Sequence, residues 1–411
     1  MTAVPDTVLD NTNVIPVDWP QPSSDAMAHS EALVKVIKAD IKAQGGIIDF
    51  TRYMQHALYA PGLGYYTAGA NKFGPAGDFI TAPEISPLFG RCLARQCQQA
   101  LLALSKTADG AILEVGAGSG KLARDILLEL TALDCLPARY FILESSADLR
   151  QRQQALLQNS VADYFDHIEW LDALPAAPFS GVVLANEFLD ALPVNRLIKS
   201  DNQFQELGVI VENGCLQYKK LKAETIATST LQQRLEPLST EFDTDYIAEL
   251  CLAMDGWIAS LAACLQQALI LFIDYGSARH EYYHPQRAQG SLRCHYRHRA
   301  HDAPFVYPGL QDITAHVDFT ALAEAAINNQ LEVLGYTNQA YFLMSCGLTE
   351  NVDMESATDV ERVEIAQQIR RLTLPGEMGE TFKVMALGCD LPADLLANLL
   401  GFSIRDLRGH L

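Results

Sequence analysis

The stretch Ile112-Leu-Glu-Val-Gly-Ala-Gly-Ser-Gly120 decides the fold that this sequence predicts. It begins as a short apolar run, which is typical of a buried strand, and it ends as a glycine-rich turn before a helical pattern. Small residues in such a turn let the backbone approach a ligand closely, and the N-terminus of the following helix supplies oriented N–H groups. The stretch therefore predicts a ligand site at the end of a strand.

Short apolar runs alternate with helical patterns around this stretch. That alternation is typical of a mostly parallel, doubly wound α/β sheet with helices on both faces. Two later runs are expected to close the sheet, the second of them as an antiparallel strand. The expected strands span 111–115, 140–143, 167–170, 181–185, 269–273, 331–335 and 382–387, and the expected helices span 122–130, 147–157 and 245–267.

The segment before the stretch shows helical patterns without strands between them. Apolar spacing predicts helices over 33–41 and 49–59, and Ser86-Pro87 is expected to begin a third. The inserted region at 275–330 and residues 347–380 are expected to be irregular. We divide the chain into a flexible arm (1–28), an N-terminal helical segment (29–110), a core (111–274), an inserted region (275–330), the end of the sheet (331–390) and a tail (391–411).

Composition and charge exclude several classes of protein. The chain has 411 residues, of which 49% are hydrophobic, and no apolar run approaches the roughly 20 residues of a membrane span. Lys and Arg total 30 against 50 Asp and Glu, and the net charge of −20 argues against nucleic acid as a partner. Residues 1–30 hold no Lys or Arg, and the nine cysteines form no CxxC pair, so we expect a cytoplasmic protein.

Two carboxylates accompany the glycine turn. Glu144 ends the next expected strand, where a carboxylate can accept hydrogen bonds from both ribose hydroxyls of a nucleoside. Glu114 lies directly before Gly116, Gly118 and Gly120, where it can orient the turn or meet a cationic ligand. S-Adenosylmethionine carries a sulfonium and an amino group but no phosphate, so this acidic setting favours it over a ligand with a pyrophosphate.

Two other nucleotide motifs can be tested on the same residues. A P-loop fails because Val115 stands at its first glycine position and Leu122 follows Lys121. The dinucleotide pattern G-x-G-x-x-A is met by Gly118-Ser-Gly120-Lys-Leu-Ala123, so an NAD-dependent oxidoreductase stays an alternative.

Polar groups follow the expected strand at 181–185. Ligands bind beyond the carboxyl ends of strands in open α/β sheets, so Asn186 and Glu187 face the expected reaction zone, with Asp190 behind them. Methyl transfer needs a nucleophile held in line with the donor, and carboxylates would orient a guanidinium nitrogen. These three residues are the candidate catalytic residues, although helix capping would also explain Asn186 and Asp190. Asp274-Tyr275-Gly276, at the end of the fifth strand, points into the same region.

Further motifs lie outside the glycine turn: Gly77-Asp78-Phe79-Ile-Thr81-Ala-Pro83-Glu84, Asn186-Glu187-Phe-Leu-Asp190-Ala-Leu-Pro193, Ile273-Asp274-Tyr275-Gly276, Tyr307-Pro-Gly-Leu-Gln-Asp312-Ile-Thr-Ala-His316-Val-Asp318 and Met378-Gly-Glu-Thr-Phe-Lys383. With the glycine turn, and in this order, they resemble the MidA family of class I methyltransferases. The resemblance runs from about Gly45 to Leu387.

The resemblance implies a seven-stranded methyltransferase sheet, S-adenosyl-L-methionine as donor and a protein acceptor, preferably an arginine side chain. It also implies that Gly77, Asp78 and Phe79, with Thr81 and Glu84, close over the cofactor. Mitochondrial members of the family are linked to protein-arginine methylation and respiratory complex I assembly. A respiratory-complex subunit is therefore a candidate acceptor, and a homodimer is a candidate assembly. Because it lacks a basic leader, the chain resembles a bacterial-type member.

The inserted region is basic and aromatic in an otherwise acidic chain. From Arg279 to His301 it holds five arginines and one acid. His295, His298 and His301 are spaced by three, but the arginines around them would repel a cation, so we expect no metal site. We expect the region to dock an acidic protein or to pair with the chain's own carboxylates. Docking without catalysis would make the chain a cofactor-binding assembly factor.

Overall fold

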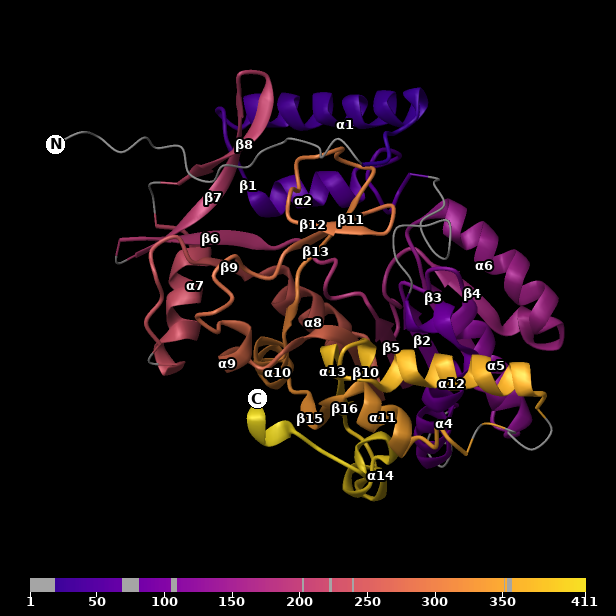
Figure 1. Ribbon diagram of the computed structural model, residues 1–411. Helices are drawn as coiled ribbons and strands as arrows, with labels where there is room; N and C mark the ends of the chain where they lie inside the picture. The colour runs from indigo at the N-terminus through magenta and orange to yellow at the C-terminus, as the bar shows by residue number, and fades with distance from the viewer. Residues whose placement is uncertain are drawn as a thin grey trace.

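The computed structural model describes residues 19–68, 81–104, 109–201, 203–221, 224–238, 240–350, 352 and 357–411. The elements form three sheets surrounded by helices (Figure 1). In these ranges, no helix is both long and apolar enough to cross a membrane.

The largest sheet contains β2 (Ala111–Val115), β3 (Arg139–Leu143), β4 (Ile168–Leu171), β5 (Phe179–Asn186), β10 (Leu265–Ser277), β15 (Glu332–Asn338) and β16 (Phe382–Cys389), with the short β14 (Val317–Asp318) beside the end of β10. The seven longer strands run in the order β15–β16–β10–β5–β2–β3–β4. β16 is antiparallel to both neighbours, and the other pairs in this row are parallel. The expected seven-stranded, mostly parallel sheet with an antiparallel closing strand is confirmed.

Helices cover both faces of this sheet because its strands are apolar on both sides. Ile112 of β2 packs in one hydrophobic cluster and Leu113 in the other, and Val182 and Val183 of β5 alternate in the same way. Burial on both faces is typical of a parallel sheet. One face is covered by α4 (Pro87–Leu104), α5 (Lys121–Ala132), α6 (Ala147–Ser160), α11 (Gln339–Ser345) and α14 (Ala393–Ala397), and the other by α8 (Ala253–Ala263) and α10 (Phe319–Asn328).

A second, antiparallel sheet was not predicted, although four of its five strands lie within the expected core, 111–274. It contains β1 (Ile48–Asp49), β6 (Asn195–Ser200), β7 (Gln203–Glu212), β8 (Cys215–Lys220) and β9 (Ile247–Leu250). Its two faces carry different helices, because Leu197 and Ile198 of β6 point to opposite sides. The helices are α1 (Ser24–Ala43) and α2 (Phe50–Tyr59) on one face and α7 (Ile226–Leu235) on the other.

The expected helix over 245–267 is wrong. These residues form β9, then α8, and then the first residues of β10. All four residues of β9 are buried, and a short apolar run of this kind does not by itself distinguish a buried strand from a helix. The backbone partners of β9 lie on β6, about 50 residues earlier in the chain, and they make the strand the stable choice.

The two insertions are more regular than the sequence pattern predicts. The first contains α9 (Arg279–Tyr282) and a three-stranded sheet of β11 (Arg293–Tyr296), β12 (Arg299–His301) and β13 (Asp312–Thr314). The second contains α12 (Asp359–Thr373) and α13 (Met378–Thr381). The side chains of Thr358 and Glu361 form a reciprocal capping box at the start of α12, and the spacing Thr-x-x-Glu was a readable signal for it.

The N-terminal segment packs against the first insertion. Trp19 stacks on Tyr296 with ring centroids 6.4 Å apart and meets His301 edge-on at 4.6 Å. Ser23 caps α1, which therefore begins inside the segment 1–28 that was expected to be a flexible arm. The basic insertion thus makes intramolecular contacts through its aromatic side chains.

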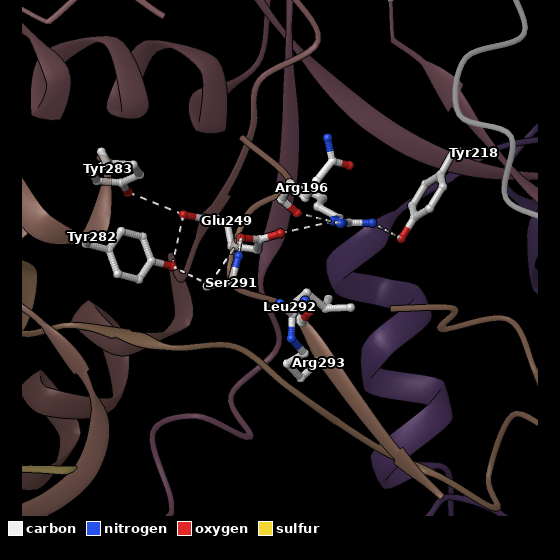
Figure 2. A network of polar contacts seen from close by, with 9 residues as sticks. Arg196, Tyr218, Glu249, Tyr282, Tyr283, Ser291, Leu292 and Arg293 are labelled. Carbon is white, nitrogen blue, oxygen red and sulfur yellow. Dashed lines mark hydrogen bonds and ion pairs between the residues drawn. The ribbon is translucent and has the colours of Figure 1, made fainter. Parts of the chain in front are cut away.

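A buried ion pair within the second sheet hydrogen-bonds to the first insertion (Figure 2). Nε of Arg196 donates to Oε1 of Glu249 at 3.0 Å, and Nη1 donates to the hydroxyl of Tyr218 at 2.8 Å. The other carboxylate oxygen of Glu249 accepts from the N–H of Ser291 at 2.6 Å and from its hydroxyl at 3.1 Å. Because a buried charge that loses its partner is costly, this network fixes the chain directly before β11.

Candidate active site

A cavity of about 350 Å³ opens where β2, β3, β4 and β5 end. This is the edge at which open α/β sheets bind ligands, and the volume suits a small-molecule site. Of the residues that the sequence predicts for the site, Thr81, Glu84, Glu114, Gly116, Gly118, Glu144, Asn186, Glu187 and Asp190 line the cavity. Gly120 lies at the N-cap of α5, behind the lining. Gly77, Asp78 and Phe79 lie outside the described residues.

The glycine turn needs glycine for its backbone conformation. Gly116, Gly118 and Gly120 have φ of 70°, 54° and 81°, the left-handed region that residues with a Cβ rarely adopt. The N–H of Gly116 donates to the carbonyl of Leu143 at 3.0 Å, which ties the turn to the end of β3. The turn is therefore held open toward the cavity by its own geometry.

Gln153 of α6 connects the glycine turn to Glu144. Its fully buried amide nitrogen donates to the carbonyl of Gly118 at 2.9 Å and to the Glu144 carboxylate at 3.2 Å. Its amide oxygen accepts from the indole N–H of Trp170 at 2.9 Å. Sequence reasoning missed this residue, because a glutamine on a helix gives no local sign that it is buried between two loops.

The variant Gln153→Leu is expected to lower the free energy of unfolding by about 1–3 kcal/mol, since it leaves buried polar partners without hydrogen bonds. Denaturant unfolding followed by circular dichroism measures this. The matched control is Gln154→Leu, one position along the same helix and exposed, which should change stability by less than about 0.5 kcal/mol. Equal stability of the two variants would contradict the bridging role.

Glu114 is buried beneath the cavity floor. Its Oε2 accepts from the hydroxyl of Tyr140 at 2.6 Å, and its side chain is part of the cavity lining. Burial raises the pKa of Glu114, the hydrogen bond from Tyr140 partly opposes this, and the nearby Glu144 adds a smaller rise, so that the pKa is about 7. A positive ligand group above Glu114 would favour its ionised form.

The carboxylate of Glu84 lies against the start of α5, at the place where an external anion would otherwise bind. The short helix α3 (Ala82–Ile85) carries this carboxylate to the hydroxyl of Ser119 at 2.5 Å and to the ammonium of Lys121 at 2.6 Å. A pyrophosphate bound in the dinucleotide manner would lie against the backbone N–H groups of this helix N-terminus, next to the Glu84 carboxylate, which would repel it. The literal match of residues 118–123 to the dinucleotide pattern therefore does not form a pyrophosphate site here.

The loop after β5 is held in an unusual conformation. Glu187 has φ of 51°, a left-handed value that is uncommon for a residue with a side chain, and its N–H donates to the carbonyl of Ile273 at 2.8 Å. One carboxylate oxygen of Asp274 accepts from the N–H groups of Phe188, Leu189 and Asp190 at 3.2, 2.9 and 3.2 Å. Asp274, from the neighbouring strand β10, therefore shapes the loop and does not line the cavity.

Glu187 and Asp190 lie with Asn186 at one buried end of the cavity, which we call the acidic end. Burial, and then the charge of Asp190, raises the pKa of Glu187 to about 8, and burial raises the pKa of Asp190 to about 6. Within the described part of the chain, Oδ1 of Asn186 and Oδ1 of Asp190 are buried and have no hydrogen-bond partner. Buried acceptors of this kind are costly unless a donor occupies the cavity.

Two tyrosines and an aspartate that sequence reasoning missed complete the acidic end. Tyr59 and Tyr66 stack with ring centroids 5.5 Å apart; the Tyr59 hydroxyl donates to the carbonyl of Ala191 at 2.9 Å and the Tyr66 hydroxyl to Oδ1 of Asp312 at 2.8 Å. Burial raises the pKa of Tyr66 well above its usual range, so the phenol stays neutral. Their side chains come from segments far from the sheet in sequence. The lining also includes Asp172, Ala173 and Trp257, which were not predicted for the site.

Comparison with known proteins identifies relatives with the same fold and length. A family model described as an S-adenosyl-L-methionine-dependent methyltransferase matches residues 92–337. A crystal structure of a COG1565 superfamily member from Burkholderia thailandensis, bound to S-adenosyl-homocysteine, has a TM-score of 0.88 and 42% identity and covers 95% of this chain and 100% of its own.

Curated animal proteins are similar along nearly the whole chain. The mitochondrial protein arginine methyltransferase NDUFAF7 of Danio rerio is 29% identical over 410 residues, 93% of each chain. The Homo sapiens protein of the same name is 27% identical and covers 83% of this chain and 80% of its own. The prediction of a cytoplasmic protein is wrong, because these relatives are mitochondrial. Free, scattered cysteines indicate a reducing compartment and do not tell the cytosol from another one.

Proposed function

We propose that this chain, which belongs to the family of S-adenosyl-L-methionine-dependent methyltransferases that its MidA-type motifs indicated, methylates an arginine side chain of a protein. Methyl transfer and the donor follow from the family. The acceptor rests on one observation at the acidic end of the cavity: among the described residues, one buried oxygen of Asn186 and one of Asp190 have no partner. A guanidinium offers planar N–H donors and a positive charge, the two properties that such a site lacks.

The cavity residues fit the donor. We propose that Glu144 accepts from the ribose hydroxyls, that Glu114 faces the amino group, and that Gly116 and Gly118 let the backbone approach. When bound, S-adenosylmethionine supplies a methyl group on a positively charged sulfur. Thr81 and Glu84 line the same cavity, and Gly77, Asp78 and Phe79 are proposed to close over it, as the family resemblance implies.

The acceptor residues are proposed from the acidic end. Glu187 and Asp190 would hold the guanidinium and receive the proton that the methylated nitrogen releases, and the amide oxygen of Asn186 would orient one N–H. The rings of Tyr59 and Tyr66 would flank the planar group. Asp274 would act on these residues through the loop that it holds.

The relatives named protein arginine methyltransferase support an arginine acceptor. We propose that the acceptor protein is a subunit of a respiratory complex, as the family resemblance implies, and that the protein acts as a homodimer. Sedimentation velocity tests the homodimer: a single monomeric species across the working concentration range would overturn it.

Calorimetric titration with S-adenosylmethionine and with NAD tests the cofactor, and binding of NAD alone would overturn the assignment. Incubation of lysate from a deletion strain with the protein and labelled donor, followed by mass spectrometry, tests the acceptor. We expect label on arginine. Label on lysine, or in small molecules only, would exclude the proposed acceptor while leaving methyl transfer intact.

The ratio kcat/KM for the acceptor is expected to rise with pH up to about 8. Below about pH 6, both Glu187 and Asp190 are protonated and do not attract a guanidinium. As the pH rises, Asp190 ionises first and Glu187 last, so the site reaches its full negative charge above about pH 8. A pH profile at saturating donor measures this, and a flat profile between pH 6 and 8 would speak against the role of Glu187.

A further inference from the structure

A cluster of positive side chains lies beside the acidic end. Arg287, from the loop after α9, Arg293, from β11, and Lys383, from β16, all lower the pKa of His316, after the larger effect of burial. An Nη1 atom of Arg287 lies 3.5 Å from Nδ1 of His316. With its pKa lowered to about 4, His316 is neutral near pH 7 and adds no charge of its own. We call Arg287, Arg293 and Lys383 the basic cluster.

No carboxylate of the described residues forms an ion pair with any member of the basic cluster. Other arginines of the same region do have such partners: Arg279 is paired with Asp318 and Glu324. Glu281 and Glu380 raise the pKa of Lys383 from a distance, while burial lowers it more. In a chain of net charge −20, a group of cations without acidic partners is a local exception that requires a reason.

Two of the three members of the basic cluster lie on strands. Lys383 is the register partner of Asp274 across β10 and β16, and Arg293 is the register partner of Thr314 across β11 and β13. The Glu249 carboxylate binds Ser291, two residues before Arg293, as Figure 2 shows. The backbone positions of Arg293 and Lys383 are therefore fixed before any ligand arrives, which lowers part of the entropy cost of binding one.

One aromatic ring separates the basic cluster from the acidic end. Tyr275 meets the ring of His316 edge-on, with centroids 5.2 Å apart, and its hydroxyl hydrogen-bonds to Asp190. Asp312, which lines the cavity, lies on the same short strand as Thr314. A polypeptide whose arginine enters the acidic end would thus pass the basic cluster with a neighbouring side chain. Arg293 is exposed and Arg287 and Lys383 are half-buried, so an acceptor can reach them.

We infer that the basic cluster binds a carboxylate of the acceptor protein, an Asp or Glu side chain a few residues from the target arginine. This inference rests on the proposed arginine acceptor. It makes the site bipolar, with an acidic end for the guanidinium and a basic cluster for a neighbouring acid. Such a pattern selects acceptors by charge, since an arginine flanked by basic residues would meet repulsion at the cluster.

The inference is tested by binding, without catalysis. The protein is saturated with S-adenosyl-homocysteine and titrated into fluorescein-labelled, arginine-centred peptides in which one Glu is moved through each position around the arginine. A matched set carries Gln in place of Glu. Fluorescence anisotropy should show about tenfold tighter binding of the Glu peptide at one or two positions. The absence of any such position, or of binding to either set, overturns the inference.

Variants assign the preference to the cluster. The double variant Arg287→Gln/Arg293→Gln should abolish the preference for Glu, while Arg299→Gln, an exposed arginine at the other end of the same hairpin, should keep it. Persistence of the preference in the double variant also overturns the inference. Methylation of the same peptides is scored separately: a Glu preference in binding without arginine methylation would overturn the proposed function and leave the anion site standing.

Discussion

The variant Glu187→Gln is expected to lower kcat for the acceptor by roughly 10²–10³-fold. Glutamine keeps the shape of the side chain. It adopts the left-handed backbone conformation at this position as readily as glutamate does. It removes the negative charge that would hold a guanidinium and the base that would receive its proton. The affinity for S-adenosylmethionine should stay within about twofold, because the proposed donor contacts lie on the glycine turn and β3.

Single-turnover kinetics with saturating donor and calorimetric titration of the donor separate these two effects. The control Glu332→Gln removes an exposed carboxylate at the start of β15 and should leave both quantities unchanged. If Glu187→Gln weakens donor binding and leaves the single-turnover rate unaltered, the residue belongs to the donor site and the proposed catalytic role is lost.

Replacement of Glu144 by alanine is expected to weaken the binding of S-adenosylmethionine by roughly 100-fold. The Glu144 carboxylate lies at the end of β3, is only 7% exposed, and is oriented by the N–H of Ser146 at 2.9 Å and by the amide of Gln153 at 3.2 Å. An ionised acceptor held in this way can receive two ribose hydroxyls, and hydrogen bonds to a charged group are the stronger kind.

Two further variants separate lost ribose contacts from general damage. Glu144→Gln keeps the side-chain volume and should retain part of the donor affinity. Glu169→Ala removes an exposed acid of β4 and should leave the donor affinity unchanged. The register partner of Glu169 on β3 is Phe141. Thermal unfolding of each variant checks that the fold persists. Undiminished donor affinity in a folded Glu144→Ala protein would remove the ribose assignment.

The glycine turn and its two carboxylates were predictable from the sequence because their signals are local. The apolar run before Gly116 predicts a buried strand, the glycines predict a turn that only they can adopt, and Glu144 stands at the end of the next strand. These features lie within about 30 residues of one another, and Glu114, Gly116, Gly118 and Glu144 line one cavity in the structure. The mostly parallel sheet followed from the alternation of strands with helices and its closing strand from a late apolar run, whereas the order of the strands was not predicted.

The second sheet and the regular parts of the insertions were not predictable by the same route. A short run such as 247–250 can bury its apolar residues either as a strand or as a helix. Which of the two forms depends on the backbone partners that β6 supplies. The buried state of Gln153 likewise depends on two loops that approach α6 from different strands. Periodicity reports which face of an element is apolar and says nothing of what covers it.

The sequence by itself determined the sheet and the glycine turn, and it favoured a donor without a phosphate. Only the tertiary structure decided the acceptor side, where Tyr59, Tyr66 and Asp312 meet Glu187 and Asp190 in one buried space, and where the basic cluster gathers beside them. The physical reason is the range of the interactions: a turn and a strand are fixed by neighbouring residues, whereas an electrostatic site is made by charges that only packing brings together.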